Sequence, residues 1–128
     1  MPDKLKKYLG IDWGEKRIGL AVADNETKLA VPWGTVGNMD SLLDAIETED
    51  ADLLVVGLPV KMSGAQEELP AAMRDFLDKL KKRCDVPVEF LDERLTSKEA
   101  DSRAAGSTID RDAVAAMLIL QMYIDRNF

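Results

Sequence analysis

The chain has 128 residues, of which 46% are hydrophobic and 32% are charged, and its formal net charge is −7. This length and composition exclude a disordered or collagen-like chain, so we expect one packed domain over residues 1–128. No apolar run approaches the ~20 residues that cross a bilayer, and no apolar stretch of signal-peptide length opens the chain. We therefore expect a cytoplasmic protein with no membrane partner.

Histidine is absent and cysteine occurs once, which removes several classes of chemistry. Ser-His-Asp and Cys-His nucleophile systems, histidine-based zinc sites and thiolate metal clusters are all excluded. Carboxylates, lysines, arginines and hydroxyls remain, and a carboxylate-rich enzyme works most naturally through a hard cation such as Mg²⁺. The negative net charge argues against broad nonspecific binding of nucleic acid, so such a site would need local clusters of Lys and Arg.

The first half of the chain predicts three strands, a helix and a buried strand. Residues 8–13 and 17–23 are predicted strands on either side of a turn, in which we expect Gly14 to supply an unusual backbone dihedral. A third strand is expected around residues 28–36, and a short helix follows it. The run at residues 53–58 is continuously apolar, which is typical of a parallel strand buried on both faces.

The second half predicts helices that alternate with one more strand. One helical stripe within residues 66–83 consists of Leu69, Met73, Phe76, Leu77 and Leu80. Residues 86–91 form a fifth strand, and capping-box patterns at residues 96–99 and 107–110 precede a short helix and a final helix. This order predicts an α/β fold with a five-stranded mixed sheet, in which a three-strand antiparallel meander is followed by parallel strands, with helices packed on it. The arrangement is ribonuclease H-like.

Three acidic residues lie near the ends of predicted elements and are candidates for chemistry. Asp12 is near the end of an apolar strand, where a carboxylate costs desolvation unless it is paired or binds a cation. Glu93 follows the fifth strand, at the edge where parallel sheets bind ligands, and Asp112 lies in the first turns of the final helix. Each has an alternative: Asp12 as a turn aspartate, Glu93 as a surface partner of Arg94, and Asp112 as a helix-dipole residue. Only the three together resemble a metal site.

Several segments between residues 8 and 123 resemble the YqgF/RuvX family in order and spacing. The segments are LGIDWG at 9–14, KRIGLAV at 16–22, VVGLP at 55–59, DERLT at 92–96, DAVAA at 112–116 and LILQ at 118–121. Proteins of this family are described as Holliday junction resolvases and as nucleases that mature the 5′ end of precursor 16S ribosomal RNA. The resemblance implies a ribonuclease H-like fold and an acidic triad of Asp12, Glu93 and Asp112, which binds Mg²⁺ or Mn²⁺ for phosphodiester hydrolysis.

The function that the resemblance implies is a divalent-metal-dependent nuclease that processes precursor 16S rRNA in ribosome biogenesis. One alternative is a Holliday junction resolvase acting in DNA recombination and repair, since both substrates use the same metal chemistry. Another is a noncatalytic RNA- or factor-binding protein on the same fold. The expected partner is structured nucleic acid, with precursor rRNA favoured over branched DNA. We expect a monomer or weak dimer, because no long apolar stripe is left over to specify a dimer.

Five basic residues near the proposed triad are candidates for contacting substrate phosphates. They are Lys16, Arg17, Lys61, Arg94 and Arg111. The stretch at residues 97–109 is usually longer and more basic in the family, and here it holds only Lys98 and Arg103. We therefore expect weak but salt-tolerant binding of nucleic acid. The basic run at residues 79–83 is expected to be a solvated helix end, where cations suit the helix dipole.

Overall fold

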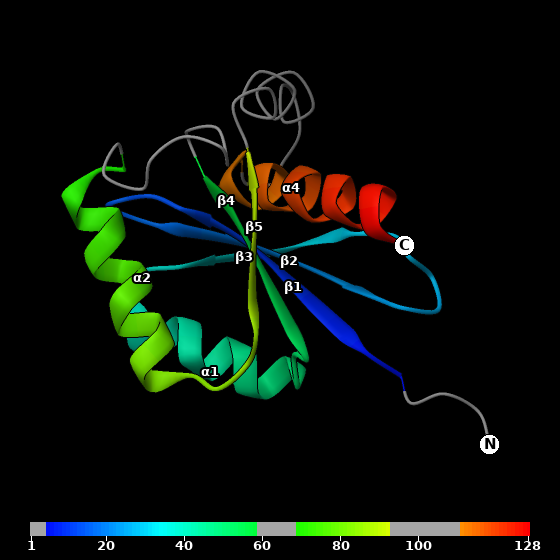
Figure 1. The fold of residues 1–128 in the computed structure, drawn as a ribbon, viewed down its shortest axis with the longest axis horizontal. Helices are drawn as coiled ribbons and strands as arrows, with labels where there is room; N and C mark the ends of the chain where they lie inside the picture. The colour runs from blue at the N-terminus through cyan, green and yellow to red at the C-terminus, as the bar shows by residue number, and fades with distance from the viewer. Residues whose placement is uncertain (1–4, 59–68, 93–110) are drawn as a thin grey trace.

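Five strands form one sheet with helices on both faces in the computed structural model, which describes residues 5–58, 69–92 and 111–128 (Figure 1). The strands are β1 Lys7–Trp13, β2 Ile18–Asp24, β3 Val31–Val36, β4 Leu53–Leu58 and β5 Val88–Asp92. The helices are α1 Met39–Glu49, α2 Ala71–Arg83 and α4 Arg111–Asn127. None of the helices in these ranges is long and apolar enough to cross a membrane. The short helix predicted after residues 96–99 falls outside the described residues.

The sheet has the strand order β3-β2-β1-β4-β5 and combines two kinds of pairing. β1 pairs antiparallel with β2, and β2 pairs antiparallel with β3. β1 pairs parallel with β4, and β4 pairs parallel with β5. The predicted meander followed by parallel strands is therefore confirmed. The C-terminal ends of β1, β4 and β5 meet at one edge of the sheet, which is where sheets of this kind bind ligands.

Two strands, β3 and β5, begin two or more residues later than predicted, and each delay has a local cause. β3 begins at Val31 because the preceding residues form a turn, in which the Lys28 amide donates to the Asp24 carbonyl oxygen at 3.0 Å and Lys28 has a φ of 55°. β5 begins at Val88 because Pro87 has no amide hydrogen to contribute to the ladder. Hydrophobic alternation alone does not reveal either boundary.

The turn between β1 and β2 needs a glycine for a different reason from the one expected. A positive φ occurs at Gly34, at 142°, but not at Gly14, so the unusual dihedral predicted for Gly14 is wrong. A Cβ at Gly14 would lie 2.8 Å from the Arg17 carbonyl oxygen, which is closer than real Cβ atoms come to such an atom. The glycine therefore permits a close backbone approach that tightens the turn.

The two faces of the sheet pack against different helices (Figure 1). On one face, Leu9 and Ile11 of β1 are fully buried against the apolar stripes of α1 and α2. The opposite face carries Tyr8 and Gly10, and it packs against α4. Side chains alternate between the faces of a strand, so β1 buries both sets of residues and lies at the centre of the molecule.

Candidate functional site

Asp12 lies near the end of β1, on the face of the sheet that α4 covers. It shares this face with Gly10, two residues earlier, because side chains alternate along a strand. Gly10 identifies the face, since a Cβ there would lie 2.7 Å from the Ala116 carbonyl oxygen of α4. Asp12 is half-buried, and its partner across the antiparallel pair with β2 is Gly19. The Asp12 side chain therefore starts beside α4, at the ligand-binding edge of the sheet.

Gly19 allows the first turn of α4 to approach this same position. A Cβ at Gly19 would overlap the carbonyl oxygen of Asp112, which is the second residue of α4. Gly19 is directly opposite Asp12 in the sheet, and Asp112 lies over the face of Gly19. The backbones at Asp12 and Asp112 are therefore both next to this one glycine. The structure thus brings two of the three candidate acids to one end and one face of the sheet.

The Asp112 carboxylate lies between two arginine side chains. Arg17 Nε is 3.1 Å from Asp112 Oδ2, and Arg111 Nη1 is 3.7 Å from Asp112 Oδ1. The Asp112 side chain is 20% exposed, whereas the Arg17 side chain is 64% exposed. Asp112 also lies in the first turn of α4, where the helix dipole favours negative charge. The helix-dipole interpretation of Asp112 therefore agrees with its position in the structure, and the metal-ligand role stays a prediction.

The remaining predicted site residues fall into two groups. Lys16 is exposed in the turn between β1 and β2, and Arg111 is exposed at the start of α4, so both lie on the segments that carry Arg17 and Asp112. The candidates that fall outside the described residues are Glu93, Lys61 and Arg94.

The donor atoms at this end of the sheet suit a hard divalent cation. Asp12 and Asp112 supply carboxylate oxygens from two separate elements, and such oxygens are the ligands that Mg²⁺ and Mn²⁺ prefer. Within residues 5–58, 69–92 and 111–128, no group of three acidic, cysteine or histidine side chains could hold a metal ion. A complete three-carboxylate site would need an acid from the rest of the chain.

Two features of the site were missed from the sequence. The motifs of the sequence do not mark Gly19 as part of the site, although an isolated glycine in an apolar strand is a known signal of close backbone approach. Arg17 was expected to contact phosphate, and its pairing with Asp112 was not foreseen. No local pattern reports that pair, because it depends on how the β1–β2 turn meets α4.

A family model described as "RuvX: Holliday junction resolvase" matches residues 6–126. The chain belongs to the RuvX family. Two curated relatives carry the name "Putative pre-16S rRNA nuclease". The one from Endomicrobium trichonymphae is 35% identical over 94% of this chain and 96% of its own length. The one from Rickettsia bellii (strain OSU 85-389) is 35% identical over 91% of this chain and 84% of its own length. The resemblance read from the six sequence segments is confirmed.

Solved structures similar to this RuvX-family chain share its fold. RuvC of T. thermophilus, in complex with a Holliday junction substrate, superposes with a TM-score of 0.59 and 17% sequence identity. The match covers 94% of each chain. At this identity the likeness concerns the fold alone, and it confirms the ribonuclease H-like fold predicted from the order of elements.

Proposed function

We propose that this RuvX-family protein is a divalent-metal-dependent nuclease that hydrolyses phosphodiester bonds in precursor 16S rRNA. The observation that carries the proposal is the placement of Asp12 and Asp112 on one face and at one end of the sheet. Arginine side chains lie beside Asp112, so negative ligands for a cation and positive groups for a phosphate occur together. A binding protein without catalytic activity would not require this combination.

Asp12, Glu93 and Asp112 are the residues that would hold Mg²⁺ or Mn²⁺. Glu93 is included because it directly follows Asp92, the last residue of β5. β5 lies two strands from β1, and two strand spacings amount to about 9.6 Å. The longer side chain of a glutamate suits a ligand that comes from the more distant strand.

The other residues of the site would bind and orient the substrate. Bound cations of this kind activate water and stabilise the leaving oxygen, which supplies the chemistry that a histidine base would otherwise provide. The chain has no histidine that could act as such a base. Lys16, Arg17 and Arg111 are exposed around the two acids, where they can hold phosphate oxygens on either side of the scissile bond.

Arg17 has a second task in this proposal. It pairs with Asp112 at 3.1 Å, and so supplies positive charge to this carboxylate. Its exposed side chain is free to rotate toward solvent. If Asp112 held a cation, the Arg17 guanidinium would be available to a substrate phosphate.

We favour precursor rRNA as the substrate because of the names and the sequence identity of the relatives. Chains that are 35% identical over almost the whole length carry a pre-16S rRNA nuclease name, whereas the RuvC match is 17% identical. A second candidate is Holliday junction cleavage, which is favoured by the family description and by the junction-bound structure of similar fold. Symmetric cleavage of a junction requires two active sites, and so a dimer.

Side-by-side cleavage assays distinguish the two substrates. A precursor 16S rRNA fragment with its 5′ extension and a four-way DNA junction are each incubated with the protein in Mg²⁺ and then in Mn²⁺. The proposal predicts cleavage of the RNA at its 5′ extension, dependent on the metal, and little cleavage of the junction. Cleavage of the junction alone would establish the second candidate, and cleavage of neither would favour a noncatalytic protein.

A further inference from the structure

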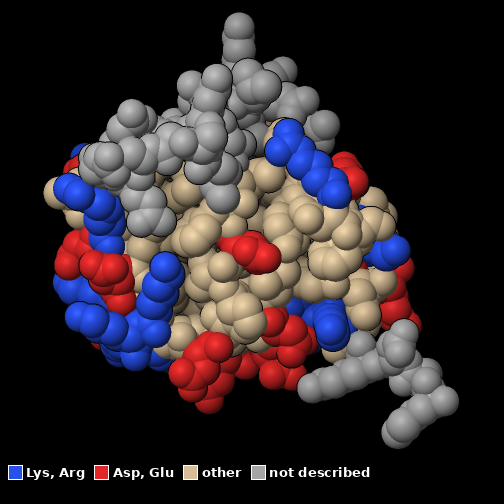
Figure 2. Space-filling model, viewed as in Figure 1, with Lys and Arg blue, Asp and Glu red and all other residues tan. Residues whose placement is uncertain are grey.

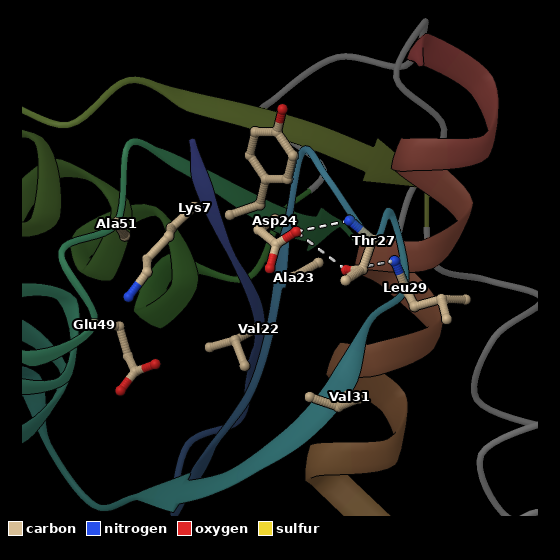
Figure 3. Close-up of a pocket in the computed structure, with 10 residues that line it drawn as sticks. Lys7, Val22, Ala23, Asp24, Thr27, Leu29, Val31, Glu49 and Ala51 are labelled. Atoms are coloured by element: carbon tan, nitrogen blue, oxygen red, sulfur yellow. Dashed lines mark hydrogen bonds between the residues drawn. The ribbon is translucent and has the colours of Figure 1, made fainter. Parts of the chain in front are cut away.

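A second candidate site is an apolar cavity of about 440 Å³ at the opposite end of the sheet (Figure 3). Its lining includes Lys7 and Tyr8 at the start of β1, whereas Asp12 lies near the end of that strand. At ~3.3 Å per residue, Tyr8 and Asp12 are about 13 Å apart. Figure 3 shows Val22 between Glu49 on one side and Val31 on the other. The cavity is therefore separate from the proposed nuclease site.

Much of the apolar surface at this cavity is exposed to solvent. The exposed fractions are 65% for Leu29 and 51% for Val31, which both line the cavity, and 39% for nearby Trp33. Contiguous exposed apolar surface marks interaction sites, and the cavity volume is in the range of known binding pockets. Its floor is partly the pair Val22 and Val31, which are register partners on β2 and β3.

The backbone of β3 is poorly suited to extend the sheet into a partner. β3 is an edge strand that contains Pro32, which has no amide hydrogen, and its pairing with β2 shifts register between Leu20 and Ala21. A proline and a bulge are the devices by which edge strands avoid pairing with other chains. A partner at this edge would therefore be recognised through the side chains in the cavity.

Acidic residues outnumber basic ones on the segments that surround the cavity, which we call the acidic rim. Of the charged residues that line the cavity itself, Asp24 and Glu49 are acidic and Lys7 is basic. Backbone bonds bring three segments together here, because the Asn25 amide donates to the Lys6 carbonyl oxygen and the Asp52 amide to that of Lys7. The segments are residues 6–7, 24–28 and 47–52. They carry six carboxylates against three ammonium groups: Asp24, Glu26, Glu47, Glu49, Asp50 and Asp52 against Lys6, Lys7 and Lys28. The last turn of α1 has no basic residue, although a helix C-terminus favours cations. Figure 2 shows acidic side chains along the lower edge of the molecule, where Figure 1 places α1.

We propose that this cavity docks a Lys- and Arg-rich segment of another protein, which inserts one large apolar side chain between Val22, Leu29 and Val31. The acidic rim repels the phosphates of nucleic acid, so the RNA substrate is not the occupant. The chain is itself acidic, with a net charge of −7, so a second copy would be repelled.

A second copy is also disfavoured because the basic run at residues 79–83 already makes contacts within its own chain. Arg83 bonds to Asp40 at 2.8 Å, Lys79 pairs with Asp75 at 3.0 Å, and Lys81 lies over the Phe90 ring. Docking of this run into the cavity of another copy would make a head-to-tail contact, which generates rings or open chains of molecules. A foreign basic segment avoids both difficulties.

The test uses the peptide Gly-Arg-Lys-Arg-Leu-Lys-Arg-Lys-Gly as a probe. The peptide is titrated into ¹⁵N-labelled protein while amide NMR shifts are recorded, and shifts are expected at residues 22–31 and 47–52. Replacing the peptide leucine by glycine should weaken binding by at least about tenfold, because burial of one leucine contributes that much. Shifts at the Asp12 and Asp112 end, or no shifts at millimolar peptide, would overturn the proposal.

Charge is tested with Glu49→Lys and the matched control Asp85→Lys. Both changes raise the net charge of the chain by two, but Asp85 lies after α2 and does not line the cavity. We expect Glu49→Lys to weaken peptide binding about fivefold or more and Asp85→Lys to change it less than twofold. Equal effects of the two variants would overturn the docking site. Shifts of the same amides when the protein concentration alone is raised would also overturn it, because they would mean that a second copy binds there.

The apolar contact is tested with Leu29→Ser. Leu29 is mostly exposed, so the change leaves the core intact while removing apolar surface from the cavity. We expect weaker peptide binding with unchanged cleavage of RNA, because Leu29 is at the opposite end from the proposed nuclease site. Unchanged peptide binding would refute the docking site, and it would leave the proposed nuclease function untouched.

Discussion

Arg17 and Asp112 are far apart in the sequence, and their pairing is the residue-level feature that most affects the proposed site. The sequence assigns each residue a plausible role by itself, Arg17 to phosphate and Asp112 to a cation. The 3.1 Å distance between Arg17 Nε and Asp112 Oδ2 links the two roles, because a cation at Asp112 must compete with the guanidinium. Long-range pairs of this kind depend on the meeting of a turn and a helix, which periodicity does not report.

We expect Arg17→Gln to strengthen cation binding while slightly destabilising the cation-free protein. Loss of the competing charge should lower the Kd for Mn²⁺ by about threefold to tenfold. This is the effect on affinity expected from one nearby unit charge at high dielectric. Loss of the mostly exposed ion pair should cost at most about 1 kcal/mol of unfolding free energy. Calorimetric titration with Mn²⁺ and thermal melting measure the two effects.

Lys16→Gln is the matched control for this prediction. It removes the same charge from the adjacent residue, which is exposed. A clearly smaller change in Mn²⁺ affinity is expected for Lys16→Gln. Weaker Mn²⁺ binding by Arg17→Gln, or equal effects of both variants, would contradict direct competition at Asp112.

The hydrogen bonds of the Asp24 carboxylate predict how the stability of the protein depends on pH. The backbone amide of Thr27 donates to the Asp24 carboxylate at 2.8 Å and, together with the Glu26 amide, holds the pKa of Asp24 below its ordinary value. A lowered pKa in the folded state stabilises the fold above the ordinary carboxyl pKa of about 3.9, and this contribution is lost as pH falls through the folded-state value. Asp24→Asn should therefore lower the melting temperature at pH 7 and have less effect near pH 3. A constant difference across this range would contradict the argument.

At the scale of elements, the strand order follows from the sequence because each strand has a clear pattern and the connections allow few topologies. An apolar strand that is buried on both faces, such as Leu53–Leu58, is expected between two parallel neighbours. It lies between β1 and β5. The boundaries that were mistaken lie where a turn or a proline interrupts pairing, at the starts of β3 and β5. These are decided by single hydrogen bonds, which hydrophobic periodicity does not specify.

The site was predictable only in part for a related reason. Asp12 and Asp112 stand out because each is an acid at the end of an apolar element. Their convergence depends on Gly19, which lets α4 lie against β2. A glycine within a strand indicates that another backbone or a ligand lies close to it, but the sequence does not show which element this is.

We expect Gly19→Ala to destabilise the protein strongly. The added Cβ would overlap the Asp112 backbone, which can move only if the whole first turn of α4 moves. Such overpacking costs typically 1–3 kcal/mol, and the displaced Asp112 should also weaken Mn²⁺ binding. Urea denaturation and Mn²⁺ titration provide the two readouts.

Gly37→Ala is the control, because nothing lies within 4 Å of a Cβ at that position. It should leave stability unchanged or raise it by about 0.4–1 kcal/mol through loss of unfolded-state freedom. If Gly19→Ala were as well tolerated as Gly37→Ala, the close approach of α4 to β2 would not exist in solution.

At the scale of the whole molecule, the two ends of the sheet differ in the ligands they suit. The end with Asp12 and Asp112 combines acids with Lys16, Arg17 and Arg111, which fits a cation and a phosphate chain. The opposite end has an apolar cavity with an acidic rim, which fits a basic protein segment. The net charge of −7 limits the attraction of nucleic acid to the first end.

This limit predicts a shallow salt dependence of RNA binding. Each phosphate contact with single-stranded RNA contributes about −0.7 to the slope of log K against log salt concentration. With five basic candidates at most, the slope should be no steeper than about −4 for the Asp12→Asn variant, which we expect to bind without cleaving. Fluorescence anisotropy across a series of KCl concentrations measures it. A steeper slope would mean that a second subunit or a partner supplies further positive charge.

Mg²⁺-dependent cleavage of the rRNA precursor by the parent protein and by Asp12→Asn tests the nuclease site most directly. We predict that the parent cleaves and that the variant loses at least about a hundredfold in rate, equivalent to roughly 3 kcal/mol, because a ligand of the cation is gone. The cation-free variant should melt at the same temperature as the parent or higher, since it has one fewer clustered carboxylate. Full activity in a folded Asp12→Asn protein would contradict the assignment of this end of the sheet as the metal-dependent nuclease site.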